Sequence, residues 1–382
     1  PNTSHAFCRL MSAAMAGQGI RTVPLPVGRQ EAIRMGKKYV HNDICFPAQI
    51  VIGEILSTLR SGQYDVKRTA VAMGKYVGDC RLTHYGALLR KALDDAGFSQ
   101  VPILTNDDED SHSLHPGFHM NLSSSLKIAF GLPMIDVLEE LLRKIRPYET
   151  KEGSAQKAFD AAMDDVITGI EKHGISGALR GFKKAVKRMG QVSYDRSALR
   201  PRVLIVGEYL LNFHPGANHD IEEYLEKNGF EIIEARMTDV IQKTYFYQDC
   251  QIREYRVDRP LFKKIWYRSA DLAFHLAHML TDRIASAHPL YEKAARIEEL
   301  AKESDPVIPH TFDAGEGILI PGEILHHAGK DAELSSSFSP LAVCPIMWWG
   351  GESPKRSRKS IRTRRSCRWI MIRTSALPIS KT

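Results

Sequence analysis

The sequence predicts an α/β protein made of two Rossmann-like or flavodoxin-like lobes with parallel sheets, joined by a helical segment. Short apolar runs alternate with helical patterns in residues 1–120, and apolar residues recur at helical spacing through residues 121–200. A second strand–helix–strand pattern then occupies residues 201–332. The length of 382 residues is enough for two domains that each bury a core. Residues 333–382 continue neither pattern.

The first lobe begins with a helix for which Ser4 is a suitable N-cap, and a strand is expected at Ile20–Pro26. The runs Ala70–Met73 and Val101–Thr105 are short and mostly apolar, as in buried strands, and a helical pattern lies between them. This order is typical of a parallel sheet covered by helices, in which ligands bind beyond the strand ends. The acidic run 106–110 follows the last strand and is either a ligand loop or a solvated turn.

Two cysteines of this lobe, Cys45 and Cys80, each stand where a loop changes into a helix. Apolar residues at helical spacing follow the first cysteine over residues 50–59 and the second over residues 88–93. The start of a helix offers unpaired N–H groups and the positive end of the helix dipole, which favour a thiolate over a thiol. Both cysteines are therefore candidate metal ligands. The alternative is that both are small buried residues that only fill space.

The second lobe opens at Pro201 with a buried strand over Arg202–Glu208. A helix is expected over Ile221–Asn228, ending at Gly229, and a second strand over Phe230–Ala235. These elements repeat the strand–helix–strand order of the first lobe and predict a second parallel sheet.

Polar residues of the second lobe suggest a substrate site. Asn212, His214 and Asn218 lie in the loop between the first strand and its helix, which is the usual ligand position in α/β folds. The loop lacks the dinucleotide glycine spacing and a phosphate-loop lysine, so neither NAD nor ATP is indicated. His275 and His278 lie on one face of a later helix without a carboxylate at metal spacing, and we interpret them as structural.

Composition limits the partners and the compartment. The six cysteines are too widely spread for a disulfide framework, so a reducing cytoplasm is expected. The sequence contains no run of about 18 apolar residues, so it does not predict a membrane-spanning helix. The net charge of +7 comes from residues 351–382, which carry ten Lys or Arg and one acid, whereas residues 1–350 have a net charge of about −2. We therefore expect neither nucleic acid nor a membrane as a partner.

Four motifs occur in one order along the chain. They are residues 39–47 around Cys45, Gly78-Asp79-Cys80-Arg81, the strand end Val206-Gly207-Glu208 with its Asn-rich loop, and Gly315-Glu316-Gly317. Together they resemble the 2-hydroxyacyl-CoA dehydratase D-component superfamily, and more closely its acyl-CoA dehydratase activase-related branch, which is 2-hydroxyglutaryl-CoA dehydratase-like. The resemblance covers most of residues 1–330.

The resemblance implies an oxygen-sensitive [4Fe-4S] cluster held by three cysteines between two α/β lobes, with Cys45 and Cys80 as two of its ligands. It also implies a partner, an ATP-dependent activator ATPase of the actin and sugar-kinase fold, which injects one electron and could be fused in longer relatives. The implied activity is that of a lyase, a radical dehydratase or reductase that acts on a CoA thioester or a related small molecule. Iron–sulfur clusters bind thiolates, and helix N-termini stabilise their negative charge.

The third cysteine of the family lies in a strand-end motif, Gly-Cys-Leu-Pro-Asn-His, from which residues 340–351 depart even though they include Cys344. With suitable codons, a shift of two nucleotides turns Glu333–Arg356 into a peptide that contains this motif. The same shift gives Trp369–Ile379 a second family-like motif. We therefore expect a frameshift after about residue 332, loss of the third ligand, and a disordered basic tail over residues 333–382. The alternative is a genuine basic tail that binds nucleic acid or an anionic membrane.

Two function hypotheses follow. The first is an iron–sulfur component that accepts an electron from the activator ATPase and acts in a radical dehydratase or reductase. The second is a non-enzymatic two-lobe module that binds a small ligand or a structural metal in the cleft between its lobes.

Overall fold

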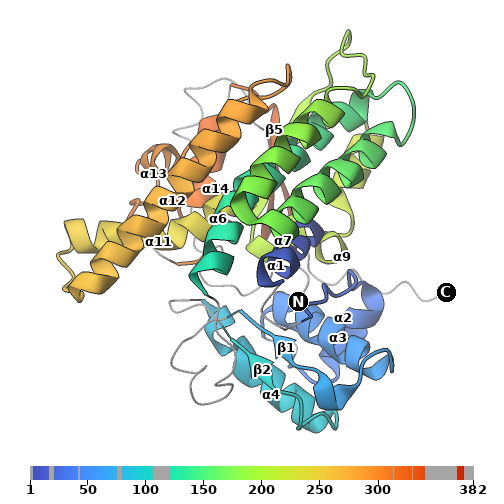
Figure 1. Cartoon of the computed structure of the whole chain (residues 1–382), viewed down its shortest axis with the longest axis vertical. Coiled ribbons are helices and arrows are strands. Elements are labelled where there is room, and N and C mark those ends of the chain that lie inside the picture. Colours follow the sequence, from blue (N-terminus) through green and yellow to red (C-terminus); the bar gives the residue numbers. More distant parts are fainter. Residues whose placement is uncertain are drawn as a thin grey trace.

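The computed structural model shows a mixed α/β protein that is mostly helical and contains two small parallel sheets (Figure 1). Loops and helices surround both sheets, and the smaller sheet lies at one end of the molecule, at the bottom of Figure 1. The residues that the structure describes are 3–16, 21–41, 44–74, 80–105, 121–312, 314–328, 330–339 and the strand 368–373.

The smaller sheet consists of two short strands that the sequence predicted. β1 (Val71–Ala72) pairs in parallel with β2 (Ile103–Leu104), and Val71 lies opposite Ile103. Helices pack around this pair and form one unit with it. They are α2 (Gln30–Lys37), α3 (Phe46–Arg60), η1 (Val66–Arg68), η2 (Arg81–His84) and α4 (Tyr85–Asp95).

The strand predicted at Ile20–Pro26 is wrong for residues 21–26, which have no regular secondary structure. Pro24 and Pro26 lack the backbone N–H that a strand needs on the side that pairs with a neighbour. The predicted acidic loop over residues 106–110 lies outside the described residues.

A group of long helices forms the largest core, and it includes the helix at the start of the chain. Ser4 caps α1 as predicted, because its hydroxyl accepts the N–H of Phe7. This helix packs on the helices of residues 121–200 rather than beside β1, and Leu10 is fully buried there. The members of the group are α1 (His5–Met15), α6 (Leu122–Ile145), α7 (Ser154–Met189), which is broken by a kink at Gly174, and α12 (Leu261–Ala285). The short turn η3 (Arg146–Tyr148) follows α6.

None of the described helices is both long enough and apolar enough to cross a lipid bilayer.

The larger sheet has four parallel strands in the order β4-β3-β5-β6. Its first two strands lie close to their predicted positions. The strands are β3 (Arg202–Gly207), β4 (Glu231–Glu234), β5 (Leu334–Ser339) and β6 (Arg368–Arg373). The helices connected to them are α8 (Tyr209–Phe213), α9 (Pro215–Asn218), α10 (Ile221–Lys227), α11 (Met237–Glu254), α13 (Ile297–Ser304) and α14 (Leu319–His327).

The two faces of β3 are covered by different parts of the chain. Leu204 and Val206 pack against α14 on one face, whereas Ile205 packs with residues of α3 and α4 on the other. At the end of the strand, Gly207 has φ 155°, and a Cβ there would lie 2.3 Å from the carbonyl oxygen of Phe338 in β5. Only glycine fits between these two strands at this point.

The expectation of a disordered tail from residue 333 onward is wrong for two segments. β5 pairs with β3 from Leu334 to Phe338, and the Phe338 side chain is 1% exposed in the same core as α3 and α4. β6 in turn pairs with β5. The sequence of β5 contains only two apolar residues among serines, so its pattern gave little sign of a strand, and its backbone pairing with β3 stabilises it instead.

The hydrophobic core is continuous between the two sheets. Ile55 of α3 and Leu89 of α4 belong to the same buried cluster as Ile205 and Phe338. The coarse prediction of an α/β fold with parallel sheets is confirmed, and the finer one of two Rossmann-like lobes stays a prediction.

His327, the last residue of α14, lies between two carboxyl groups. Its Nδ1 is 2.8 Å from Asp331, and its Nε2 is 3.3 Å from Glu323. Burial lowers the pKa of His327, but the hydrogen bonds to Asp331 and Glu323 outweigh burial and raise the pKa from 6.5 to about 9. The stabilisation from the charged imidazole is therefore complete below pH 6.5 and is lost as the pH rises through 9.

We expect the free energy of unfolding of the wild-type protein to fall relative to that of His327→Gln as the pH rises from 6.5 to 9. The loss should not exceed about 3 kcal/mol, because one pKa unit corresponds to about 1.4 kcal/mol. Chemical denaturation at several pH values measures the difference, and two parallel pH profiles would contradict the expectation.

Candidate functional site

Cys45 is the N-cap of α3, as the sequence predicted, and its backbone is extended at φ −69° and ψ 132°. Pro47 lies in the first turn, where its missing N–H costs no hydrogen bond, so it favours a helix that begins at this point. The cysteine is 4% exposed, and its thiol forms a hydrogen bond with the hydroxyl of Tyr85 at the start of α4. The thiol is therefore enclosed between the starts of two helices.

Cys80 is the N-cap of η2, which leads directly into α4. Its Sγ accepts the backbone N–H of Leu82 at 3.5 Å, as expected for a side chain that caps a helical turn. The two predicted ligands lie in the same region, because the Cys45 thiol forms a hydrogen bond with Tyr85 and Cys80 caps the turn that leads into Tyr85. Each thiol is also within electrostatic range of Tyr85.

Two buried carboxyl groups meet at the carboxyl end of β3. Glu208 is the N-cap of α8, and its side chain accepts the N–H of Leu211 at 3.1 Å. Glu316 reaches the same place from the segment before α14, where it accepts the N–H of Tyr209 at 3.0 Å. Burial, and then the charge of Glu316, raise the pKa of Glu208 above its usual range. The pair is therefore expected to keep one proton near neutral pH.

The carboxyl groups lie within electrostatic range of the cysteines, and we refer to Cys45, Cys80, Glu208 and Glu316 as the thiol–carboxyl cluster. The charge of Glu208 acts on both thiols, and that of Glu316 acts on Cys80. Lys243 of α11 is 4% exposed and offsets part of this negative charge, since it lowers the pKa of both Cys80 and Glu316. Two thiols, two carboxyls and one ammonium group thus lie within electrostatic range of one another, although no three ligand atoms of the thiol–carboxyl cluster lie within 4.8 Å of one another.

The expectation that the helix starts favour the thiolate is wrong for the metal-free protein. Burial raises the pKa of Cys45 to about 12, and the charge of Glu208 adds to this effect. Burial also raises the pKa of Cys80, although the N–H of Leu82 and the ammonium of Lys243 oppose it. Both cysteines are therefore thiols until a bound cation favours the deprotonated form.

The three predicted substrate residues are all buried in the loop after β3, but they have different surroundings. His214 lies 2.7 Å from Glu54, and Asn218 donates to the backbone oxygen of Asn212 at 3.2 Å. The side-chain oxygen of Asn212 has no hydrogen-bond partner. It lies at a small cavity that Glu316 also lines, so Asn212 has an acceptor available for a ligand.

Glu208 and Glu316 belong to motifs of the sequence but were not predicted as site residues. Each follows a glycine, at Gly207-Glu208 and Gly315-Glu316. For Glu208, a polar residue next to a glycine at a strand end was the signal that could have identified it. Glu316 lies in a turn before α14, and its place in the Gly315-Glu316-Gly317 motif was the signal in that case. Cys344, the doubtful third ligand, lies outside the described residues.

Comparison with protein-family models, curated proteins and solved structures gives no match to this chain. The resemblance to the dehydratase superfamily therefore depends on the four sequence motifs alone.

Proposed function

We propose that this chain is the iron–sulfur component of an ATP-activated radical 2-hydroxyacyl-CoA dehydratase or reductase. The observation that supports it is the thiol–carboxyl cluster, in which Cys45 and Cys80 both occupy N-cap positions in one region of the fold and lie within electrostatic range of Glu208 at the end of β3. The proposal includes the finer fold prediction of two Rossmann-like or flavodoxin-like lobes, with the cluster between them. It also includes a cytoplasmic location.

The donor set is suited to a [4Fe-4S] cluster, for which Cys45 and Cys80 would supply two thiolates. Such a cluster would accept one electron from the activator ATPase of the actin and sugar-kinase fold. A third thiolate is not assigned, since Cys344 lies outside the described residues and is expected to be out of frame.

The other residues of the site would bind the substrate and supply a proton to it. Glu208 and Glu316 hold a proton that the dehydration of a 2-hydroxyacyl group needs at its departing hydroxyl. Lys243 limits the build-up of negative charge beside the thiols. Asn212 offers a buried acceptor oxygen at the neighbouring cavity, which has room for about one water molecule and would have to open before part of a CoA thioester or a related small molecule could enter.

Anaerobic reconstitution with iron and sulfide tests the proposal. The protein should turn brown, bind iron and sulfide together, and lose its colour in air, as expected for an oxygen-sensitive cluster. We expect weak retention of iron by this chain and tight retention after the reading frame beyond residue 332 is restored. A protein that stays colourless under both conditions would exclude the iron–sulfur function. If Cys344→Ala abolished iron binding in the chain as it is, the frameshift would be wrong and Cys344 would be the third ligand.

The second hypothesis is a non-enzymatic module that binds a small ligand or a structural metal. Zinc accepts sulfur and oxygen ligands, but the thiols and carboxyls of the thiol–carboxyl cluster would have to move closer together to hold one ion, since no three of their ligand atoms lie within 4.8 Å of one another. This alternative predicts a colourless, air-stable protein whose zinc is lost in Cys45→Ala and Cys80→Ala.

A further inference from the structure

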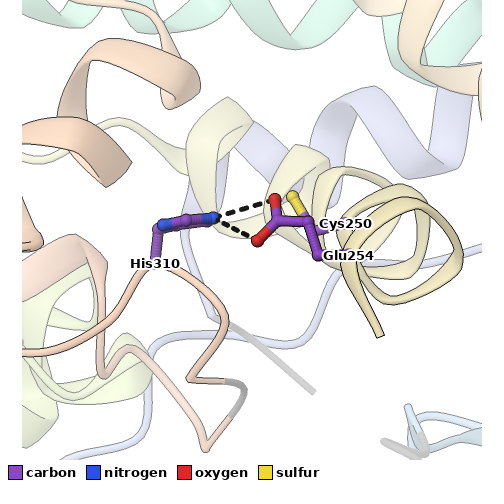
Figure 2. A group of neighbouring side chains, drawn as sticks. All are labelled: Cys250, Glu254 and His310. Atoms are coloured by element: carbon purple, nitrogen blue, oxygen red, sulfur yellow. Dashed lines mark hydrogen bonds and ion pairs between the residues drawn. The ribbon is translucent and has the colours of Figure 1, made fainter. Parts of the chain in front are cut away.

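Three metal-binding side chains meet near the C-terminal end of α11, outside the thiol–carboxyl cluster. The sulfur of Cys250, a carboxylate oxygen of Glu254 and a ring nitrogen of His310 lie within 4.8 Å of one another. Figure 2 shows the imidazole pointing toward the carboxylate of Glu254, with the sulfur of Cys250 beside it. Cys250 and Glu254 are one helical turn apart and project from the same face, while His310 comes from the segment after α13.

A second carboxylate orients the histidine. Nδ1 of His310 is 2.8 Å from Asp305, and the same Asp305 oxygen accepts the backbone N–H of His310 at 2.9 Å. Its Nε2 faces Glu254 at 2.9 Å. Histidines that bind metals in proteins usually donate the other ring N–H to a carboxylate, which fixes the ring. Asp305 occupies that position here and leaves Nε2 directed at the other two donors.

The segment that carries His310 is also held next to α11 by a second contact. The hydroxyl groups of Tyr255 and Thr311 are 2.7 Å apart. The position of His310 relative to Cys250 and Glu254 therefore does not depend on the histidine alone. A metal bound by these residues would hold the segment that leads to Glu316 against α11.

The donors match zinc in kind and in spacing. Zinc binds cysteine sulfur, histidine nitrogen and carboxylate oxygen, and a tetrahedral ion separates its ligand atoms by roughly 3.3–3.8 Å. Small side-chain rotations would bring the three atoms to this spacing from the observed separations within 4.8 Å. Cys250 is 1% exposed, whereas the side chains of His310 and Glu254 are 29% and 41% exposed, so solvent reaches the site from one side.

A second group of possible ligands provides a contrast. His275 lies 3.4 Å from Asp271 and 3.0 Å from Glu298, so the prediction that this histidine has no companion carboxylate is wrong. Asp271 lies four residues before His275 on α12, a spacing that the sequence shows, whereas Glu298 comes from a different helix, α13. This group contains no thiol and is less selective for zinc.

We propose that Cys250, Glu254 and His310 bind one zinc ion, with a water molecule as the fourth ligand and with Asp305 as a positioning residue. Binding replaces the proton on the thiol by the Zn–S bond and releases that proton to solvent, with no change in oxidation state. This site is separate from the thiol–carboxyl cluster and does not depend on the proposed iron–sulfur function.

Zinc titration of the metal-free chain against a competing chelator tests the site, with Co²⁺ as a spectroscopic probe. We expect one tight zinc ion and a thiolate-to-cobalt charge-transfer band. Cys250→Ser and His310→Gln should each weaken zinc binding at least about 100-fold, and Cys250→Ser should abolish the band. Asp305→Asn should weaken binding about 10–100-fold, as is usual for residues that orient a ligand.

Matched variants separate this site from the other candidates. His275→Gln and the double variant Cys45→Ala/Cys80→Ala should keep both the tight zinc ion and the charge-transfer band. Circular dichroism identifies any variant that fails to fold, and the His310 substitution, in a partly exposed segment, remains informative if Cys250→Ser is unstable. Unchanged zinc affinity in folded His310→Gln, or no saturable zinc binding by the wild-type chain, would overturn the proposal.

Discussion

Cys45→Ala and Cys80→Ala are each expected to lose most of the iron that the reconstituted wild-type protein binds. Each substitution removes one of the two thiols of the thiol–carboxyl cluster. Iron–sulfur clusters are held by thiolates, and alanine offers no replacement ligand. Both residues are N-caps, and their helices are stabilised mainly by packing against the rest of the protein. We therefore expect each variant to fold, so that its iron content can be measured.

Cys250→Ala is the matched control for these variants. Cys250 is also buried and carries a thiol of raised pKa, but it lies in α11 beside Glu254 and His310. Its substitution should leave the iron and sulfide content at the wild-type level. Equal iron in all three variants would mean that Cys45 and Cys80 do not bind it.

Glu54→Ala is expected to cause the largest loss of stability, about 2–5 kcal/mol, because two donors lose their acceptor at a cost of about 1–3 kcal/mol for each buried group left unsatisfied. Glu54 of α3 is 2% exposed and His214 is fully buried. Nδ1 of His214 accepts the N–H of Ala217 at 3.1 Å, so the ring hydrogen is on Nε2 and is donated to Glu54 at 2.7 Å. Glu54 also accepts the N–H of Gly28 at 2.5 Å. Alanine would leave the buried Nε2–H of His214 and the half-buried N–H of Gly28 without this acceptor.

Chemical denaturation of three variants checks this expectation. Glu54→Gln should cost less than Glu54→Ala, because its amide oxygen can still accept from Gly28 and His214. Glu31→Ala changes an exposed glutamate of α2 and should alter the free energy of unfolding by less than about 0.5 kcal/mol. A Glu54→Ala variant as stable as Glu31→Ala would show that this contact between α3 and the loop after β3 does not stabilise the fold.

The parts of the fold that depend on residues close together in the sequence could be predicted from it. Ser4 caps α1, Cys45 and Cys80 stand at helix starts, and Gly229 follows α10 with φ 86°, all as the local patterns indicate. The position of β3 was also predicted within a residue, because a run of buried apolar residues ends there in a glycine.

The parts of the fold and of the candidate site that depend on residues far apart in the sequence could not be predicted from it. No local pattern shows that Glu316 reaches the start of α8, or that His310 meets Glu254 of α11. The acidity of Cys45 was misjudged for the same reason. Its helix start was visible in the sequence, but its burial and the nearby charge of Glu208 come from the tertiary structure and have the larger effect.

X-ray absorption at the iron edge tests most directly whether Cys45 and Cys80 hold an iron–sulfur cluster. The reconstituted wild-type protein should show sulfur neighbours around iron together with iron–iron scattering, and the double variant Cys45→Ala/Cys80→Ala should show neither signal. A wild-type spectrum with only nitrogen or oxygen neighbours and no iron–iron scattering, or an identical spectrum from the double variant, would contradict the assignment.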